Sequence, residues 1–276
     1  MIITKEETEY YHNIYMQGIS TLKLGKMFNL NPDTLRENFH RYGLYVRSNK
    51  ENSRRFFADF NYFERIDTAE KAYWLGFIYA DGYVSSTNGK RFGMSLSIKD
   101  IDHLEKLNRC LKSTYPINTY TVNHGYKIGS EYCRLIISSD KLYDDLVNQG
   151  VYEHKTNIIQ KPNIEKQFYA PFILGLFDGD GSIFLNHTKS PFYNINFMGT
   201  LDIIEFIQNY FIEEKLVSYL NKPYQKREGQ SVYALRYGGN VIVEKIMTHL
   251  YQTVDTDLPL KRKYELYLKC KQRKFD

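Results

Sequence analysis

The sequence contains no long apolar run and few cysteines, and both shortages limit what the chain can be. No stretch reaches the roughly 18–20 consecutive apolar residues that a membrane span requires. The first seven residues also lack the apolar core of a secretory signal peptide. The three cysteines, Cys110, Cys133 and Cys270, show no metal-ligand spacing and cannot all pair. We therefore expect reduced thiols and a soluble protein of the cytoplasm.

Charge and aromatic content exclude few classes of function. The 37 lysines and arginines exceed the 32 acidic residues, and the net charge of +5 is compatible with nucleic acid as a partner. Basic residues are concentrated near the end of the chain, at positions 261–274. The 25 tyrosines and 17 phenylalanines are expected mainly in cores and interfaces, with base stacking as a minor alternative.

Two similar nonapeptides, at residues 74–82 (WLGFIYADG) and 173–181 (ILGLFDGDG), are the most informative feature of the chain. Each is an apolar run typical of a buried helix, with small residues at i and i+4 and an Asp-Gly pair at its end. Glycine is unfavourable inside a helix, so its presence needs a packing reason. We predict that the two helices pack closely side by side through Gly76 and Ala80 of one and Gly175 and Gly179 of the other.

The last acids of the two nonapeptides, Asp81 and Asp180, lie 99 positions apart (180 − 81). Each would lie at the negative end of a helix dipole, where a carboxylate is unfavourable unless a cation is near. Two such carboxylates fit a divalent metal ion, Mg²⁺ or Mn²⁺, whose coordination is completed by water and phosphate. The spacing therefore predicts one metal-binding carboxylate from each of two domain-sized units.

The two nonapeptides resemble the LAGLIDADG motif of homing endonucleases, in the single-chain form that carries two motifs. The lead-in segment at residues 63–76 resembles free-standing members of phages and mobile elements. Tyr79 departs from the pattern because the family often has an acid there, whereas Asp178 occupies that place in the second motif. Neither departure changes the terminal acids, Asp81 and Asp180.

This resemblance implies a fold, a reaction and a partner. The fold class is α+β, with two pseudo-symmetric αββαββα repeats that form a DNA-binding saddle, preceded by a small all-α domain. The reaction is site-specific double-strand DNA cleavage by a divalent-metal mechanism, with one Asp from each repeat and the main-chain carbonyls of Ala80 and Gly179 as further ligands. A monomer would read a long asymmetric site, and the protein would be intracellular, nucleoid-associated or phage-encoded.

The chain divides into four predicted segments. Residues 1–47 resemble a helix-turn-helix domain, with helices over 6–16, 20–28 and 32–42; residues 48–70 form a basic linker; and residues 71–162 and 163–276 form the two repeats. The exposed face of the third helix carries Arg36, His40 and Arg41, beside Asp33 and Glu37, and could enter a major groove. Arg54 and Arg55, with Arg47 and Lys50 nearby, could contact phosphates.

Each repeat is predicted to run helix, hairpin, helix, hairpin, helix. After each nonapeptide, strands are expected near 83–87, 91–99, 117–123 and 132–138 in the first repeat and near 182–187, 192–198, 219–226 and 231–237 in the second. Helices are expected at 101–112, 140–148, 201–215 and 241–251.

Polar residues alternate with apolar ones along several of these strands and indicate a face for a partner. Serine, asparagine, arginine and lysine are the side chains that read base edges in a major groove. The residues assigned to this DNA-binding face are Arg91, Ser95, Ser97, Lys99, Arg134, Asn194, Asn196 and Arg236. The alternative is an ordinary solvated sheet surface.

Two lysines complete the predicted catalytic set. A positive group near the scissile phosphate can stabilise developing charge or position the attacking water. Because family members often place a lysine after the last strand of each repeat, the resemblance points to Lys155 and Lys263, with Lys261 as the reserve choice for the second repeat.

Two alternative functions remain on the same scaffold. One is a catalytically silent transcription regulator that binds DNA, and the loss of a motif acid would mark that class. The other is a maturase that binds its intron RNA, which the sequence barely separates from a DNA endonuclease. Because both acids are present, we expect a metal-dependent DNA endonuclease.

Overall fold

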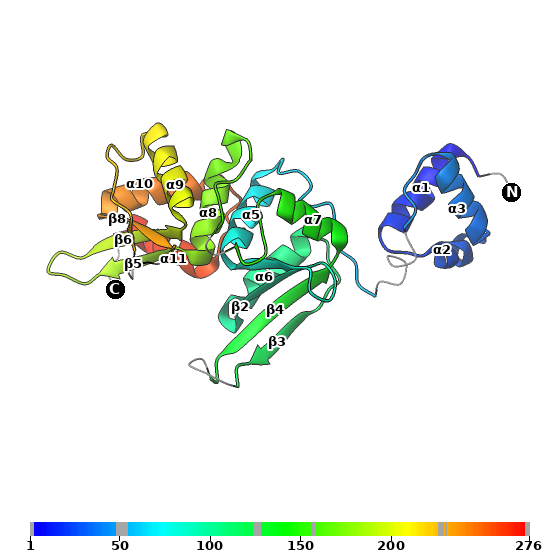
Figure 1. Cartoon of the computed structure of the whole chain (residues 1–276), viewed down its shortest axis with the longest axis horizontal. Coiled ribbons are helices and arrows are strands. Elements are labelled where there is room, and N and C mark those ends of the chain that lie inside the picture. The colour runs from blue at the N-terminus through cyan, green and yellow to red at the C-terminus, as the bar shows by residue number, and fades with distance from the viewer. Residues whose placement is uncertain are drawn as a thin grey trace. The chain divides into compact units, whose positions relative to one another are not determined.

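A computed structural model describes residues 3–47, 55–123, 128–155, 158–225, 229 and 231–273. The chain forms two compact units: one contains Met1–Ala58 with Lys112–Thr114, and the other contains Asp59–Leu111 with Tyr115–Asp276. Figure 1 shows the helices and strands of both units. Within the described ranges, no helix is long and apolar enough to cross a membrane.

The first unit is built on the helices α1 (Lys5–Met16), α2 (Thr21–Phe28) and α3 (Pro32–Arg41), which agree with the predicted helices to within one residue. Ser20 and Asn31 cap the starts of α2 and α3 with their side-chain oxygens, and proline occupies the first position of α3. Leu24, Leu35 and Phe39 are fully buried in its core. This unit therefore has its own apolar core.

The second unit contains two antiparallel sheets of four strands each within the described residues. One has the order β1-β2-β4-β3 and the other β5-β6-β8-β7, so the two repeats share one topology. The strands are β1 (Gly82–Ser85), β2 (Arg91–Ser97), β3 (Ile117–Thr121), β4 (Glu131–Ser138), β5 (Ser182–Asn186), β6 (Phe192–Gly199), β7 (Tyr224–Gln225) and β8 (Tyr233–Gly238). The predicted α+β class with duplicated repeats is confirmed.

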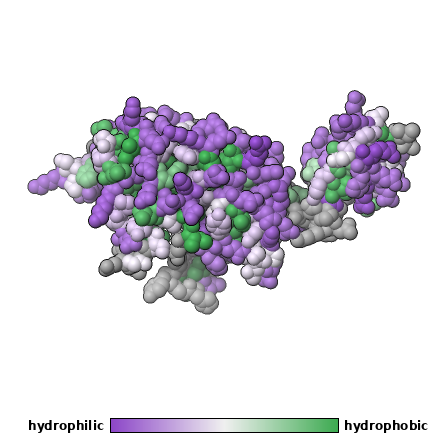
Figure 2. All heavy atoms as spheres, turned by 45° about the horizontal axis from the view of Figure 1, so that its top comes forward, coloured by the Kyte–Doolittle hydropathy of each residue, from purple (hydrophilic) through white to green (hydrophobic). Residues whose placement is uncertain are grey.

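Helices accompany each sheet, and all but the last of those named here agree with a predicted helix. They are α5 (Ala69–Asp81), α6 (Ile101–Cys110) and α7 (Asp140–Asn148) in the first repeat, and α8 (Tyr169–Asp180), α9 (Leu201–Glu213), α10 (Asn240–Tyr251) and α11 (Lys261–Lys271) in the second. Short 3-10 turns, η1 (Ile98–Asp100) and η3 (Lys166–Phe168), precede α6 and α8. Most of the visible surface of this unit is hydrophilic, with smaller apolar patches (Figure 2).

Three details differ from the sequence predictions. The strand expected over 91–99 ends at Ser97, and Lys99 lies in η1 because the chain turns there into α6. The strand expected over 219–226 is formed in the described residues only at Tyr224–Gln225, directly after Pro223, which cannot donate to a sheet. The helix α11 was not predicted as a helix at all.

Candidate active site at the ends of two helices

The helices α5 and α8 pack against each other backbone to backbone. A Cβ added at Gly76 would lie 2.0 Å from the carbonyl oxygen of Phe172, and one added at Gly175 would lie 1.9 Å from that of Tyr73. Each glycine thus faces the residue three positions before the other glycine. This reciprocal pattern is that of a local two-fold axis, and at both positions only glycine fits.

The same interface brings the two terminal acids together. Gly179 directly precedes Asp180. A Cβ added at Gly179 would lie 2.3 Å from the Cβ of Ala80 and 3.4 Å from Oδ2 of Asp81. Burial, and then the charge of Asp180, raise the pKa of Asp81 to about 6, while Lys263 and Lys155 oppose the shift.

Asp180 lies in a crowded environment but keeps its solvent access. Partial burial raises the pKa of its carboxyl group, and the positive charges of Lys155 and Lys263 act in the opposite direction. The two carboxylates therefore form a pair of interacting acids at a place that a ligand can reach.

Both predicted lysines lie at the ends of these helices. The Lys155 ammonium donates a hydrogen bond of 3.0 Å to the carbonyl oxygen of Ala80, and its pKa is lowered by burial against the opposing pull of the two aspartates. Lys263 is only 3% exposed. Its ammonium donates to the carbonyl oxygens of Phe177 (2.6 Å), Asp178 (2.7 Å), Gly179 (3.2 Å) and Gly181 (2.6 Å).

Lysines in these positions satisfy carbonyl groups that a helix end leaves without partners, and they oppose the negative end of the dipole. Burial lowers the pKa of Lys263 to about 8, and nearby Asp178 acts against this shift. Lys261, the reserve choice, is exposed. Of the two candidates in the second repeat, the structure therefore brings Lys263 to the helix end.

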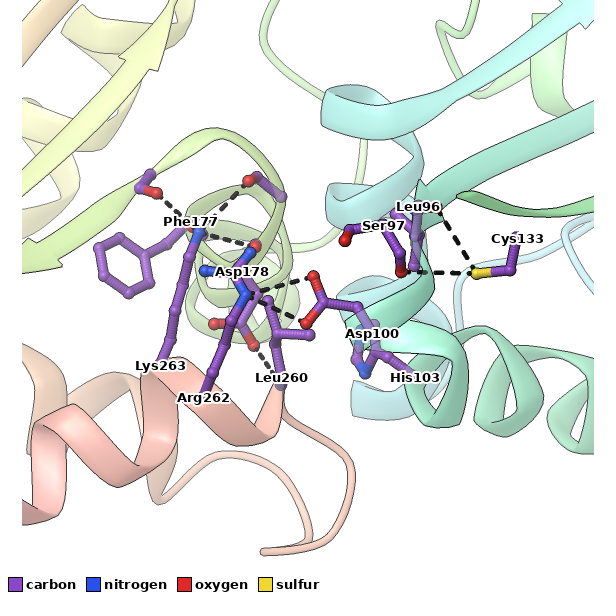
Figure 3. A network of polar contacts seen from close by, with 12 residues as sticks. Leu96, Ser97, Asp100, His103, Cys133, Phe177, Asp178, Leu260, Arg262 and Lys263 are labelled. Carbon is purple, nitrogen blue, oxygen red and sulfur yellow. Dashed lines mark hydrogen bonds and ion pairs between the residues drawn. The ribbon is translucent and has the colours of Figure 1, made fainter. Parts of the chain in front are cut away.

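A buried network that the sequence did not predict lies beside this site, and Figure 3 shows the contact between Asp178 and Leu260 within it. The Tyr73 hydroxyl and the Leu260 backbone N–H both donate to Oδ2 of the fully buried Asp178, at 2.7 and 2.8 Å. Nε2 of His103 lies 3.1 Å from the Tyr73 hydroxyl. Burial raises the pKa of Asp178 to about 6 and lowers that of His103. Since Leu260 directly precedes α11, Asp178 fixes the start of the helix that carries Lys263.

A second pair of contacts joins the repeats near the same helix. Arg262 forms an ion pair with Asp100 at 3.1 Å, and Lys106 donates to the carbonyl oxygen of Pro259 at 3.0 Å. By contrast Tyr79, where the family pattern often has an acid, is buried and its hydroxyl donates to the carbonyl oxygen of Gln149 at 2.6 Å. The two motifs therefore use their equivalent positions differently.

The residues predicted for DNA contact fall into three groups. Ser95, Ser97, Arg91 and Arg134 are half-buried on the first sheet, and Arg236 and Lys99 are exposed. Asn194 and Asn196 are instead buried, 5% and 8% exposed, and Asn196 hydrogen-bonds to Ser182 and Arg236 within the sheet. Both asparagines are therefore buried in the sheet, and their assignment to DNA contact stays a prediction.

In the first unit, Arg36, His40 and Arg41 are exposed on α3, and Arg55 is exposed after it. Arg47, expected near phosphates, is instead buried, and its guanidinium donates to the carbonyl oxygen of Ile19 at 2.7 Å and lies over the Tyr15 ring. The predicted contacts Arg54 and Lys50 lie outside the described residues.

Comparisons with known proteins agree with this arrangement. Residues 68–145 match the family described as LAGLIDADG-like domain. The structure is similar to that of the LAGLIDADG homing endonuclease I-GzeII in complex with DNA target, with a TM-score of 0.50 and 12% identity, over 73% of this chain and 88% of that one. No curated protein matches the sequence.

Further similar structures are meganuclease I-SmaMI bound to uncleaveable DNA (13% identity, TM-score 0.47, 72% and 89% of the two chains) and LAGLIDADG meganuclease I-AabMI bound to uncleaved DNA (13%, 0.46, 74% and 92%). Residues 68–145 therefore match a LAGLIDADG-like domain, and the fold of the chain is similar to that of the LAGLIDADG homing endonuclease I-GzeII.

Proposed function

We propose that this protein is an intracellular, site-specific endonuclease that cuts both strands of duplex DNA. The observation that supports it best is the meeting of Asp81 and Asp180 at the ends of two interlocked helices, one from each repeat. Each strand of the target would be cut with the help of this shared pair of carboxylates.

A divalent cation, Mg²⁺ or Mn²⁺, fits the residues at this site. The negative charge of Asp180 helps to raise the pKa of Asp81, because the two carboxylates repel each other. A bound cation relieves this repulsion. Two carboxylates, with phosphate oxygens and water, are a typical ligand set for Mg²⁺. When bound, such an ion activates water and stabilises charge on the phosphate.

The carbonyl groups of Ala80 and Gly179, the other predicted ligands, already accept hydrogen bonds from Lys155 and Lys263. Each carbonyl oxygen has a second lone pair that can face a cation. Both lysines are buried and donate to carbonyl groups at the helix ends, so we assign them as positioning residues that hold the helix ends and keep positive charge near the scissile phosphates.

DNA would lie across the two sheets, with the first unit adding contacts beyond them. In this proposal residues 1–47 are a helix-turn-helix domain, residues 48–70 a basic linker, and residues 71–162 and 163–276 the two repeats. Because the two repeats differ in sequence, one monomer would read a long asymmetric site. The exposed Arg36, His40 and Arg41 of α3 would contact the duplex directly.

Cleavage of DNA with the gene's own flanking sequences tests this function. With Mg²⁺, the full-length protein should cut both strands at one site, and EDTA or a double Asp81→Asn, Asp180→Asn variant should abolish cutting. Tight binding to a defined site without cutting in Mg²⁺ or Mn²⁺ would contradict the endonuclease and support a silent regulator. Preferential binding of the flanking RNA would support a maturase.

A further inference from the structure

Arg134, in the middle of β4, is held in a fixed position on the first sheet. Its Nε donates to Oγ of Ser95 on β2 and its Nη2 to the hydroxyl of Tyr120 on β3, both at 2.9 Å. The guanidinium carbon lies 4.5 Å from the centre of the Tyr120 ring. The neighbouring Cys133 and Leu135 are buried, so Arg134 projects from the sheet face opposite to the core.

The second sheet contains a similar arrangement, shifted by two residues along its strands. Nε of Arg236 on β8 donates to Oδ1 of Asn196 on β6 at 2.9 Å, and its Nη2 donates to the hydroxyl of Tyr224 on β7 at 3.0 Å. The guanidinium also lies over the Tyr224 ring, at 5.6 Å. A serine hydroxyl oxygen in one sheet and an asparagine amide oxygen in the other accept from Nε, so both arginines are held by similar contacts.

The contacts within the protein occupy one edge of each guanidinium and leave the other available. Nε and Nη2 form the side edge, which faces the sheet and the tyrosine. The end edge, formed by Nη1 and the second N–H of Nη2, makes no hydrogen bond to the described residues. Two parallel N–H groups on that edge match the O6 and N7 acceptors that guanine presents in the major groove.

We propose that Arg134 and Arg236 each read one guanine, one in each half of the target. In the strand register Arg134 corresponds to Ala234 and Arg236 to Ile136, so the two guanines would lie at different distances from the centre of the site. Tyr120 and Tyr224 are their positioning residues. Holding an arginine in the bound geometry before DNA arrives lowers the entropy cost of recognition. This inference rests on the proposed DNA-binding function and adds a feature of the target: one guanine in each half-site, at unequal distances from its centre.

Selection of bound duplexes from a randomised library tests the proposal with full-length protein. The wild type should enrich sequences with two such guanines. Arg134→Gln should lose the preference at one of them and Arg236→Gln at the other, by roughly 10- to 100-fold each. Tyr120→Phe and Tyr224→Phe should weaken the same preference as their arginine, by a smaller factor. Arg109→Gln, which removes an exposed arginine from α6, is the charge-matched control.

Other outcomes overturn the proposal in distinct ways. Uniform weakening across all sequences, with the slope of log affinity against log salt reduced by about one, would assign the arginines to phosphates. Unchanged preferences in folded variants, checked by thermal unfolding, would leave them as braces of the sheet. Loss of both preferences within the same half-site would refute the assignment of one guanine to each sheet. Failure of the wild type to enrich any sequence would instead refute the proposed function, and this inference with it.

Discussion

Gly179 and Ala80 face each other near the ends of α8 and α5, and the side chain of Ala80 supplies one methyl group at this contact. The substitutions Gly179→Ala and Ala80→Gly together would place that methyl group on the other helix. Gly179→Ala alone would place two Cβ atoms 2.3 Å apart, whereas real Cβ contacts are essentially never under 3.0 Å. Both atoms are attached directly to helix backbones, so neither can rotate away. The helix ends must therefore separate by at least about 0.7 Å.

The magnitude of the effect follows from two opposing terms. Overpacking a well-packed contact costs about 1–3 kcal/mol, and replacing glycine with alanine inside a helix returns up to about 1 kcal/mol. The two terms together allow a net loss of about 0–3 kcal/mol. We expect Gly179→Ala to lower the free energy of unfolding by a value in the middle of this range, about 1–2 kcal/mol, or Tm by about 2–8 °C in a chain of this size. Because Asp180 and Asp81 move apart, the cleavage rate should fall by roughly 10- to 100-fold.

The double variant Gly179→Ala, Ala80→Gly is the matched test. It restores one methyl group at the contact, and the two helix-propensity changes cancel, so stability should return to within about 0.5 kcal/mol of the wild type. Cleavage should recover as well. Urea unfolding and a cleavage time course on the wild type, the two single variants Gly179→Ala and Ala80→Gly, and the double variant give the coupling energy. Strictly additive effects of the two substitutions would refute the packing described for this interface.

Gly175→Ala has no such rescue, because its Cβ would lie 1.9 Å from the backbone oxygen of Tyr73; urea unfolding should show a loss of about 3 kcal/mol, and a loss below 1 kcal/mol would contradict the close approach. Lys263→Met removes the donor to four carbonyl oxygens, whereas Lys155→Met removes the donor to one. In EDTA at pH 7, the free energy of unfolding should therefore fall by about 3 kcal/mol or more for Lys263→Met and by about 1 kcal/mol for Lys155→Met. The pKa of the Asp81 carboxyl group is about 6 in the folded protein and 3.8 when it is fully solvated. Protonation of Asp81 therefore stabilises the folded state by up to about 3 kcal/mol below pH 3.8, and this contribution is lost as the pH rises through 6. In metal-free protein, Asp81→Asn should therefore flatten the fall in stability between pH 4 and 6, and an unchanged profile would contradict the assignment. In the wild type, cleavage should rise over the same range as the metal-binding carboxylate ionises.

The sequence predicted those parts of the fold whose signals are local. Ser20 and Asn31 mark helix starts because their side chains bond the first free N–H groups, and the alternation of polar and apolar residues marks β2. The small residues of the two nonapeptides indicated a close helix pair because glycine has no other use in the middle of an apolar helix. Asp81 and Asp180 were predicted to meet for the same reason.

The parts that could not be predicted depend on contacts between distant segments. Residues 261–271 are rich in basic residues, so their sequence did not indicate a helix that packs against the core. In the structure they form α11, whose buried face carries Lys263, Tyr267 and Cys270 at helical spacing. Nothing near Asp178 in the sequence reveals that Tyr73 and Leu260, 105 and 82 residues away, donate to it. The burial of Asn196 likewise depends on strand pairing.

The most direct test of the shared carboxylate pair is strand-resolved cleavage by the single variants Asp81→Asn and Asp180→Asn. With a target labelled separately on each strand and Mg²⁺ present, both variants should lose double-strand cutting while binding the target with wild-type affinity in EDTA. Double-strand cutting at the wild-type rate by either variant would contradict the account.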